Sequence, residues 1–200
     1  MLNQLIARYV ANTLSPLNGP IISRLAGLVK TLETDAYTPG KAAKFPVALD
    51  SEANPCTGIG KRFPDLVPDQ KERLIVYLED GGSSNNGGKW TSRLRLIGWG
   101  NADLLTGADG VLTAVLIAKI ERLLKTIRAP ADSPISSLRC EIVGTPSSSV
   151  NLFQNYTYTE TRSQFLLPPY FAFGLDLSIS FTLNLTCYDS LTGLTPDECA

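Results

Sequence analysis

Hydrophobic and polar residues alternate without interruption over residues 173–187. The apolar positions are Phe173, Leu175, Leu177, Ile179, Phe181, Leu183, Leu185 and Cys187. The intervening positions are Gly174, Asp176, Ser178, Ser180, Thr182, Asn184 and Thr186. A period of two is typical of an antiparallel strand with one buried and one solvated face. The pattern predicts a strand of about 50 Å, at roughly 3.3 Å per residue, which is unusually long.

Apolar residues at helical spacing predict three helices. The first covers residues 2–14 and ends before Pro16. The second follows at once and ends before the turn residues at 38–40. Its apolar stripe consists of Ile21, Ile22, Leu25, Leu28, Val29 and Leu32. The third covers residues 108–128 and ends in basic residues, which its dipole favours.

Period-two patterns predict the remaining strands. Residues 73–80 and 89–100 form a hairpin whose tip, residues 81–88, is rich in glycine and therefore expected to be flexible. Further strands are predicted at residues 44–49, 138–144 and 150–159. Because strands and helices are segregated along the chain, the expected fold class is α+β. The sheet is mainly antiparallel, with a long hairpin and a long C-terminal strand, packed by N-terminal helices and one central helix.

The predicted domain organisation is one domain over residues 1–188. Extended loops are expected at residues 39–72 and 81–88, and residues 189–200 are expected to be a loosely ordered tail. No run of the sequence approaches the roughly 20 apolar residues of a membrane-spanning helix. We therefore expect no membrane partner.

Composition narrows the function mainly by exclusion. The chain has 200 residues, of which 44% are hydrophobic and 18% charged, and its formal net charge is −1. A near-neutral chain argues against a protein that grips nucleic acid through phosphates. The cysteines, Cys56, Cys140, Cys187 and Cys199, form no C-x-x-C pair. We interpret them as small buried hydrophobic residues in a reducing compartment, and no cofactor or metal is predicted.

The chain contains no histidine, which removes Ser-His-Asp and Cys-His catalysis and histidine-ligated metals. Carboxylates are the remaining candidates for acid–base chemistry. Glu79 and Asp80, together with Asp103 or Asp109, form a conceivable catalytic pair, although solvated charges at strand ends are the commoner outcome. Residues 57–62 resemble a phosphate loop only superficially, because Pro55 occupies the position that requires glycine and Arg62 the position that requires a hydroxyl.

Arginine and tryptophan gather on one side of the second hairpin strand. Arg93, Arg95 and Trp99 share the same parity, and Arg73 and Tyr77 join them if the hairpin register allows. Protein interfaces favour arginine and tryptophan. A solvated strand face is an equal reading, and a platform for single-stranded nucleic acid is a third.

The order of the predicted elements resembles that of the tail-terminator and tail-completion proteins of tailed bacteriophages. The resemblance covers residues 1–188 and rests on the N-terminal helix, the hairpin at 73–79 and 93–98, the helix at 108–128 and the strands at 138–144 and 173–187. It implies a non-enzymatic structural protein of the virion, assembled in the cytoplasm of the host bacterium. Such a subunit forms a homo-oligomeric ring at the head–tail junction, or neck, or at the tail end.

The resemblance also implies partners: other copies of the chain, and neighbouring neck, portal or tail-tube proteins. No sequence-specific nucleic-acid partner is implied, although DNA can pass through a ring. The expected subunit contacts are Trp90, which braces the hairpin, together with Arg93, Arg95, Trp99, Gly82, Asn85, Asn86 and Gly87. Two alternatives remain: a small histidine-free metal-dependent enzyme or ligand-binding domain, and a monomeric adaptor protein.

Overall fold

The computed structural model of this protein consists of two α-helices and a six-stranded sheet. It describes residues 2–34, 43–50, 54–56, 66, 71–105, 111–131, 133–145, 152–157 and 167–184. The helices are α1 (Leu2–Leu14) and α2 (Val111–Leu124), with short 3-10 turns at Ser15–Leu17 and Ala102–Leu104. The strands are β1 (Arg24–Thr34), β2 (Ala43–Ala48), β3 (Leu74–Asn86), β4 (Lys89–Asn101), β5 (Ile135–Gly144) and β6 (Tyr170–Leu183).

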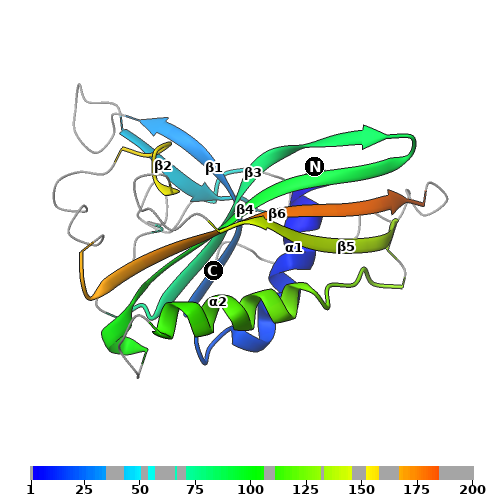
Figure 1. Ribbon diagram of the computed structural model, residues 1–200. Coiled ribbons are helices and arrows are strands. Elements are labelled where there is room, and N and C mark those ends of the chain that lie inside the picture. The colour runs from blue at the N-terminus through cyan, green and yellow to red at the C-terminus, as the bar shows by residue number, and fades with distance from the viewer. Residues whose placement is uncertain are drawn as a thin grey trace.

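The sheet has the strand order β2-β1-β3-β4-β6-β5. Strands β1 and β3 run parallel, and every other neighbouring pair is antiparallel. Helices α1 and α2 lie on the same face of this strongly twisted sheet (Figure 1). The predicted α+β class, with a mainly antiparallel sheet, is therefore confirmed.

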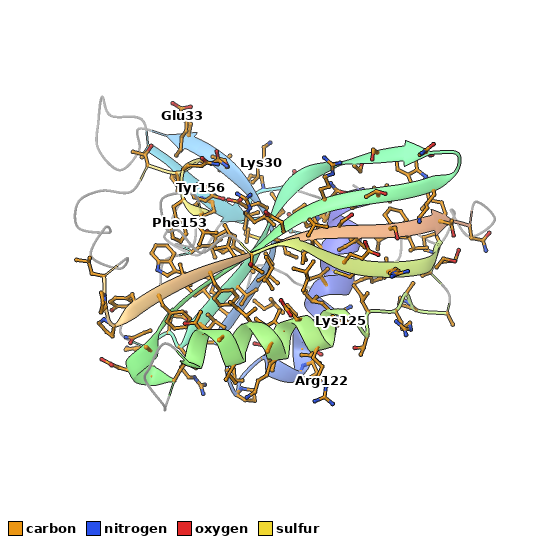
Figure 2. The ribbon with its side chains drawn as sticks, viewed as in Figure 1. Lys30, Glu33, Arg122, Lys125, Phe153 and Tyr156 are labelled. Carbon is orange, nitrogen blue, oxygen red and sulfur yellow. The ribbon has the colours of Figure 1, made fainter. Side chains whose placement is uncertain are left out.

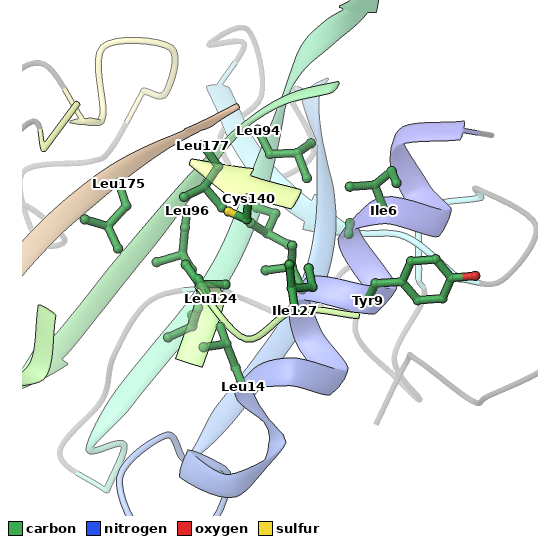
Figure 3. Close-up of a cluster of buried hydrophobic side chains, with 14 of the residues drawn as sticks. Ile6, Tyr9, Leu14, Leu94, Leu96, Leu124, Ile127, Cys140, Leu175 and Leu177 are labelled. Carbon is green, nitrogen blue, oxygen red and sulfur yellow. The ribbon is translucent and has the colours of Figure 1, made fainter. Parts of the chain in front are cut away.

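The main hydrophobic core fills the space between the helices and the sheet. Its apolar side chains come from alternate positions of the central strands and from the inner stripes of the two helices. Figure 3 shows the contributions of α1 (Ile6, Tyr9 and Leu14), the α2 region (Leu124 and Ile127), β4 (Leu94 and Leu96), β5 (Cys140) and β6 (Leu175 and Leu177). The N-terminal helix is thus held in place by burial, as its apolar spacing predicts.

A second hydrophobic cluster covers part of the opposite face of the sheet. Its centre is Trp99, which is fully buried and whose ring centroid lies 4.6 Å from that of Phe153. The buried members are Ala26, Val29, Ala48, Cys56, Leu66, Ile75, Tyr77, Ile97, Trp99, Leu152, Phe153 and Tyr156. The central strands are consequently buried on both faces along part of their length.

The long C-terminal strand is confirmed over residues 173–183, and the next described residue, Asn184, lies outside it. Strand β6 is buried at Phe173, Leu175, Leu177, Ile179 and Phe181, and the alternate residues Asp176, Ser178 and Ser180 are partly exposed. It pairs with β4 over the entire length of that strand and with β5 on its other side. Residues 185–187 of the predicted strand lie outside the described residues.

The predicted second helix is wrong, because residues 24–34 form strand β1. The reason is a β-bulge at Gly27, whose φ is +65°. Leu25 and Leu28 of β1 pair with Val76 and Leu78 of β3, so that three residues of one strand span two of the other. The bulge gives a strand the three-residue spacing that otherwise indicates a helix.

The remaining strand predictions had different outcomes. Strands β2 and β5 confirm those at residues 44–49 and 138–144. The strand predicted at residues 150–159 is wrong within its described part, 152–157, which forms a turn closed by the Tyr156 N–H donating to the Phe153 carbonyl at 3.0 Å. The described parts of the predicted 39–72 loop include β2, and the 189–200 tail lies outside the described residues.

The predicted loop at the hairpin tip is strand as far as Asn86. Strand β3 continues to Asn86 and pairs with β4 as far as Lys89, and Gly87 and Gly88 close the turn at positive φ. Both turn glycines adopt φ values that disfavour other residues. The hairpin is therefore a paired two-stranded arm as far as its turn, interrupted only by the shift in pairing between Asp80 and Ser83.

Candidate functional site

The sheet divides at Glu79 of β3. This residue pairs with Val29 of β1, which is the last pair between the two strands. Beyond it, β1 and β2 diverge from the β3–β4 hairpin (Figure 1). We call residues 80–86 of β3, 89–94 of β4, 178–183 of β6 and 135–142 of β5 the outer sheet. The part of β3, β4 and β6 on the other side of Glu79 is called the inner sheet.

A glycine bulge marks the point at which the hairpin leaves β1. The pairing of β3 with β4 shifts between Asp80 and Ser83, and Gly82 has a φ of +85°. The carboxylate oxygen Oδ1 of Asp80 accepts a hydrogen bond from the Gly82 N–H at 2.7 Å and another from the side-chain amide of Asn3. The bulge thereby ties the first turn of α1 to the base of the outer sheet.

A buried polar contact continues this connection under the sheet. Ser92 is fully buried and donates from its hydroxyl to the side-chain oxygen of Asn3, which is itself only 7% exposed. Gln4, in the same turn of α1, donates to the backbone carbonyl of Asp50. Because buried polar groups are costly unless they are hydrogen-bonded, these contacts fix the position of α1 relative to the outer sheet.

Three charged residues cross the sheet in one row at the division. Glu79 of β3 pairs with Arg95 of β4, which in turn pairs with Asp176 of β6. The Arg95 Nε atom lies 2.6 Å from Asp176 Oδ1, and its second contact, from Nη2 to Oδ2, is 3.4 Å long. These hydrogen bonds of the Arg95 guanidinium therefore go to Asp176 and not to Glu79.

The Tyr156 hydroxyl donates a hydrogen bond to the Glu79 carboxylate. Burial raises the pKa of Glu79, while the Tyr156 hydrogen bond and the positive charge of Arg95 lower it and only partly offset the effect of burial. The hydrogen bond that the Arg95 guanidinium donates to the Asp176 carboxylate raises the pKa of Arg95. Tyr156 and Phe153 lie together on the face away from the helices, close to where the strands converge (Figure 2).

Two open clefts lie on either side of Glu79. The first, of about 450 Å³, lies where β1 and β3 diverge and is lined by residues that include Asn3, Lys30, Asp80 and Tyr156. The second, of about 610 Å³, lies over the outer sheet, and Arg93 and Asp176 contribute to its lining. Because Glu79 and Asp80 line both clefts, each presents carboxylates to a ligand.

The outer sheet has one polar face, opposite the helices. Paired residues share a face, and so the face can be followed in rows across the strands. The first row contains Asn86, Lys89, Thr182 and Ser136, the second Ser84, Thr91, Ser180 and Arg139, and the third Arg93, Ser178 and Glu141. Hydroxyl, amide and charged groups thus form a continuous surface that the second hydrophobic cluster does not cover.

The structure separates the predicted contact residues. Arg93 is exposed on the polar face, whereas Arg95 is half-buried in its ion pair with Asp176. Trp99 has the same parity but is fully buried, because the second hydrophobic cluster covers this face from Ile97 onward. The prediction of Trp99 as a subunit contact is therefore wrong. Tyr77, also predicted on this face, is buried in the same cluster.

The other predicted contacts belong to the hairpin arm. Trp90 is partly buried and packs on the main core, consistent with the predicted bracing role. Gly82, Asn85, Asn86 and Gly87 are exposed. The Asn85 side chain accepts from the Gly88 N–H at 3.0 Å and so closes the turn.

Sequence reasoning missed Tyr156, Asp176 and Asn3 as members of this region. The sequence contains a feature that could have identified Asp176, because it is the one charged residue on the polar side of β6. Tyr156 and Asn3 had none, since their contacts with Glu79 and Asp80 join segments 77 residues apart in the chain.

The predicted carboxylate pair is not assembled in the described residues. Asp103 follows β4 at the far end of the inner sheet, where its backbone N–H donates to the Asn101 side chain at 3.0 Å, and Asp109 lies outside the described residues. The weak phosphate-loop match at 57–62 also lies outside them. Within the ranges that the structure describes, no three histidine, cysteine or carboxylate side chains are grouped in a way that could hold a metal ion.

Two cysteines can be described. Cys140 is a free, buried thiol, and burial raises its pKa to about 12, as expected for a small core residue. Cys56 is buried and disulfide-bonded. The interpretation of Cys56 as a free thiol is therefore wrong. No helix in the described part of the chain is long and apolar enough to cross a membrane.

Comparison with known proteins gives no match: no family model, no curated protein and no solved structure is significantly similar to this chain.

Proposed function

We propose that this protein is a non-enzymatic structural subunit that assembles with copies of itself into a ring, at the head–tail junction or tail end of a tailed bacteriophage. The observation that carries the proposal is the outer sheet. It is paired strand, it projects beyond the second hydrophobic cluster, and it leaves a polar face and a hairpin arm exposed. Surfaces of this kind suit contacts between folded subunits, in which polar groups fix orientation.

The order of elements supports the phage assignment. The resemblance rests on an N-terminal helix, a long hairpin, a central helix, a following strand and a long terminal strand. These elements correspond to α1, the β3–β4 hairpin, α2, β5 and β6. The near-neutral net charge of −1 is compatible with self-association.

The oligomeric state of the purified chain tests this function. We expect size-exclusion chromatography with light scattering, and native mass spectrometry, to give a mass that is one fixed multiple of the 21.6 kDa subunit. Arg93→Glu, on the exposed polar face, should yield a folded monomer by circular dichroism. Arg95→Glu is less suitable, because it would also break the intramolecular pair with Asp176.

Lys125→Glu provides the matched control. Lys125 is exposed and lies directly after the C-terminal end of α2, in the helical layer (Figure 2). The substitution makes the same change of charge on a different surface and should leave the assembly intact. A wild-type protein that stays monomeric at all concentrations would refute the proposal.

The clefts beside Glu79 support a second candidate, a ligand-binding domain. Glu79 is a half-buried carboxyl that lines two clefts, and groups of this kind are enriched at binding sites. Thermal denaturation with Mg²⁺, Ca²⁺, Mn²⁺ or Zn²⁺ distinguishes the two functions. Stabilisation that depends on Glu79 and Asp80, in a monomer, would favour the ligand-binding domain.

A further inference from the structure

The outer sheet has two strand edges that no described segment pairs. On one side, β3 pairs with β1 only as far as Glu79, so that residues 83–86 of β3 are paired with β4 alone. On the other side, β5 is the last strand of the sheet and pairs with β6 alone. Residues 80–86 of β3 are all exposed, as are Ser136, Arg139, Glu141 and Val143 of β5.

The opposite edge of the sheet, strand β2, is protected from pairing with a further strand. Strand β2 contains Pro46, which cannot donate a hydrogen bond to a further strand. Its backbone is also occupied, because the Thr157 N–H donates to the Lys44 carbonyl at 2.7 Å and the Cys56 N–H to the Ala48 carbonyl at 2.8 Å. Among the residues that the structure describes, the β2 edge is therefore covered and the two outer-sheet edges are not.

The free edge of β3 lacks the devices that usually prevent strand pairing. Exposed edges are commonly protected by charged residues, proline or bulges within the strand. After the bulge at Gly81 and Gly82, the β3 edge continues as Ser83, Ser84, Asn85 and Asn86, in regular register with β4 and without charge or proline.

Strand direction makes the two edges complementary. Strands β3 and β6 run one way, and β4 and β5 run the other, because every neighbouring pair in the outer sheet is antiparallel. If β5 of one copy lies beside β3 of the next copy in the same orientation, that new pair is also antiparallel. The alternation continues from copy to copy, and each joint leaves one β3 edge and one β5 edge for further copies, as a ring requires.

The two free edges also lie in the same rows of paired residues across the sheet. Ser84 of β3 and Arg139 of β5 belong to one row, and Asn86 and Ser136 belong to the next. Bulges between Ser136 and Arg139, and between Ile142 and Gly144, restrict the regular part of β5 to residues 139–142. A joint between copies would thus involve a short stretch of each strand.

We propose that β5 of one copy pairs antiparallel with residues 83–86 of β3 of the next copy, so that the ring is closed by a sheet that continues from subunit to subunit. The proposal rests on the proposed ring function and names its joint. Backbone hydrogen bonds across the joint satisfy edge groups that no described segment of the single chain pairs, and the polar rows of neighbouring copies become one surface.

Hydrogen–deuterium exchange tests the joint independently of its register. The wild-type assembly is compared with a monomeric reference, which is the Arg93→Glu variant or, where that variant still assembles, the wild-type chain dissociated by urea below its unfolding transition. Peptides covering residues 83–86 and 139–142 are followed. In the assembly, the outward amides of both segments should exchange at least about tenfold more slowly. Peptides of β2 should be unchanged and serve as the internal control.

Cysteine crosslinking tests which edges meet. Ser84→Cys is combined in turn with Ser136→Cys, Arg139→Cys and Glu141→Cys, all of which lie on the polar face. At least one pair should give, on oxidation, a ladder of covalent multimers that reducing agent abolishes. Each single variant and the wild type should give no ladder.

The results of these experiments distinguish a failure of the proposed joint from a failure of the proposed ring function. An assembled ring in which neither segment gains protection would overturn the joint and leave the ring proposal standing. Dimers from a single variant, either Ser84→Cys or Arg139→Cys, would show that like edges pair by two-fold symmetry, which also overturns the joint. A wild-type chain that remains monomeric would overturn both proposals.

Discussion

The inner and outer sheets share the same central strands but have different surroundings. In the inner sheet, β3 and β4 are buried on both faces, by the helices on one side and by the cluster around Trp99 on the other. In the outer sheet, the same strands are covered only on the helix side, and their other face carries rows of hydroxyl, amide and charged groups. This face of β4 changes from partly exposed to buried within two residues, between Arg95 and Ile97.

This difference assigns distinct tasks to the two regions. Apolar burial on both faces supplies most of the folding free energy, and the inner sheet is where that burial is concentrated. The outer sheet is held by the helix side of the core and by the contact of Asn3 with Asp80 and Ser92. Changes to the inner sheet should therefore alter stability, and, under the proposed ring function, changes to the exposed face of the outer sheet should alter assembly.

The largest effect is expected at Trp99. Trp99→Ala removes a fully buried ring that contacts Phe153 and should lower the free energy of unfolding by about 3–5 kcal/mol. Trp90→Ala is the matched control in the outer sheet, and because Trp90 is only partly buried it should cost about 1 kcal/mol. Urea denaturation measures both. Equal losses would contradict the comparison.

The next effect is expected at Gly98. A Cβ atom at this position would lie 2.3 Å from a ring carbon of Phe173 on the neighbouring strand. Gly98→Ala should therefore overpack the inner sheet and cost about 1–3 kcal/mol in urea denaturation. The double variant Gly98→Ala with Phe173→Leu removes part of the clash and should lose less than the two single losses added together; strict additivity would contradict the packing argument.

A smaller effect is expected for the ion pair at the boundary. Arg95 and Asp176 are half-buried, with side chains 29% and 33% exposed, whereas Arg139 and Glu141 on β5 are 75% and 58% exposed. Double-mutant cycles should give a coupling energy of up to about 1 kcal/mol for the first pair and close to zero for the second. A stronger coupling at the exposed pair would reverse the expected order.

The smallest expected effect is the contribution of Glu79 to the pH dependence of folding stability. Burial raises its pKa above the ordinary value of 4.5, so that the folded protein holds this proton more tightly than the unfolded chain does. Its contribution to stability is therefore full below the ordinary pKa and is lost as the pH rises through the raised pKa. Glu79→Gln should gain stability relative to wild type from pH 4 to pH 7, measured by thermal denaturation; a flat or opposite trend would contradict the burial of Glu79.

The sequence alone predicts the elements with clear periodicity. Strand β6 and helix α1 follow directly from their alternating and helical apolar positions. Strand β1 was misread because the bulge at Gly27 places Leu25 and Leu28 on the same face, three residues apart. The hydrophobic pattern of the sequence does not reveal a single-residue bulge of this kind.

The candidate site is harder to predict because it depends on contacts between distant segments. Arg93, Arg95 and Trp99 share one parity, but parity cannot show that a cluster from residues 152–156 and other segments covers Trp99 and leaves Arg93 exposed. The pairing of Arg95 with Asp176 likewise requires β4 and β6 to be neighbours, which follows from the strand order and not from local pattern.

Native mass spectrometry of the wild-type chain tests the central claim most directly. The account predicts one dominant species whose mass is a fixed multiple of 21.6 kDa and which persists on dilution. It also predicts that Arg93→Glu converts this species to folded monomer and that Lys125→Glu does not. A monomer as the dominant species of the wild-type chain at every concentration would contradict the account.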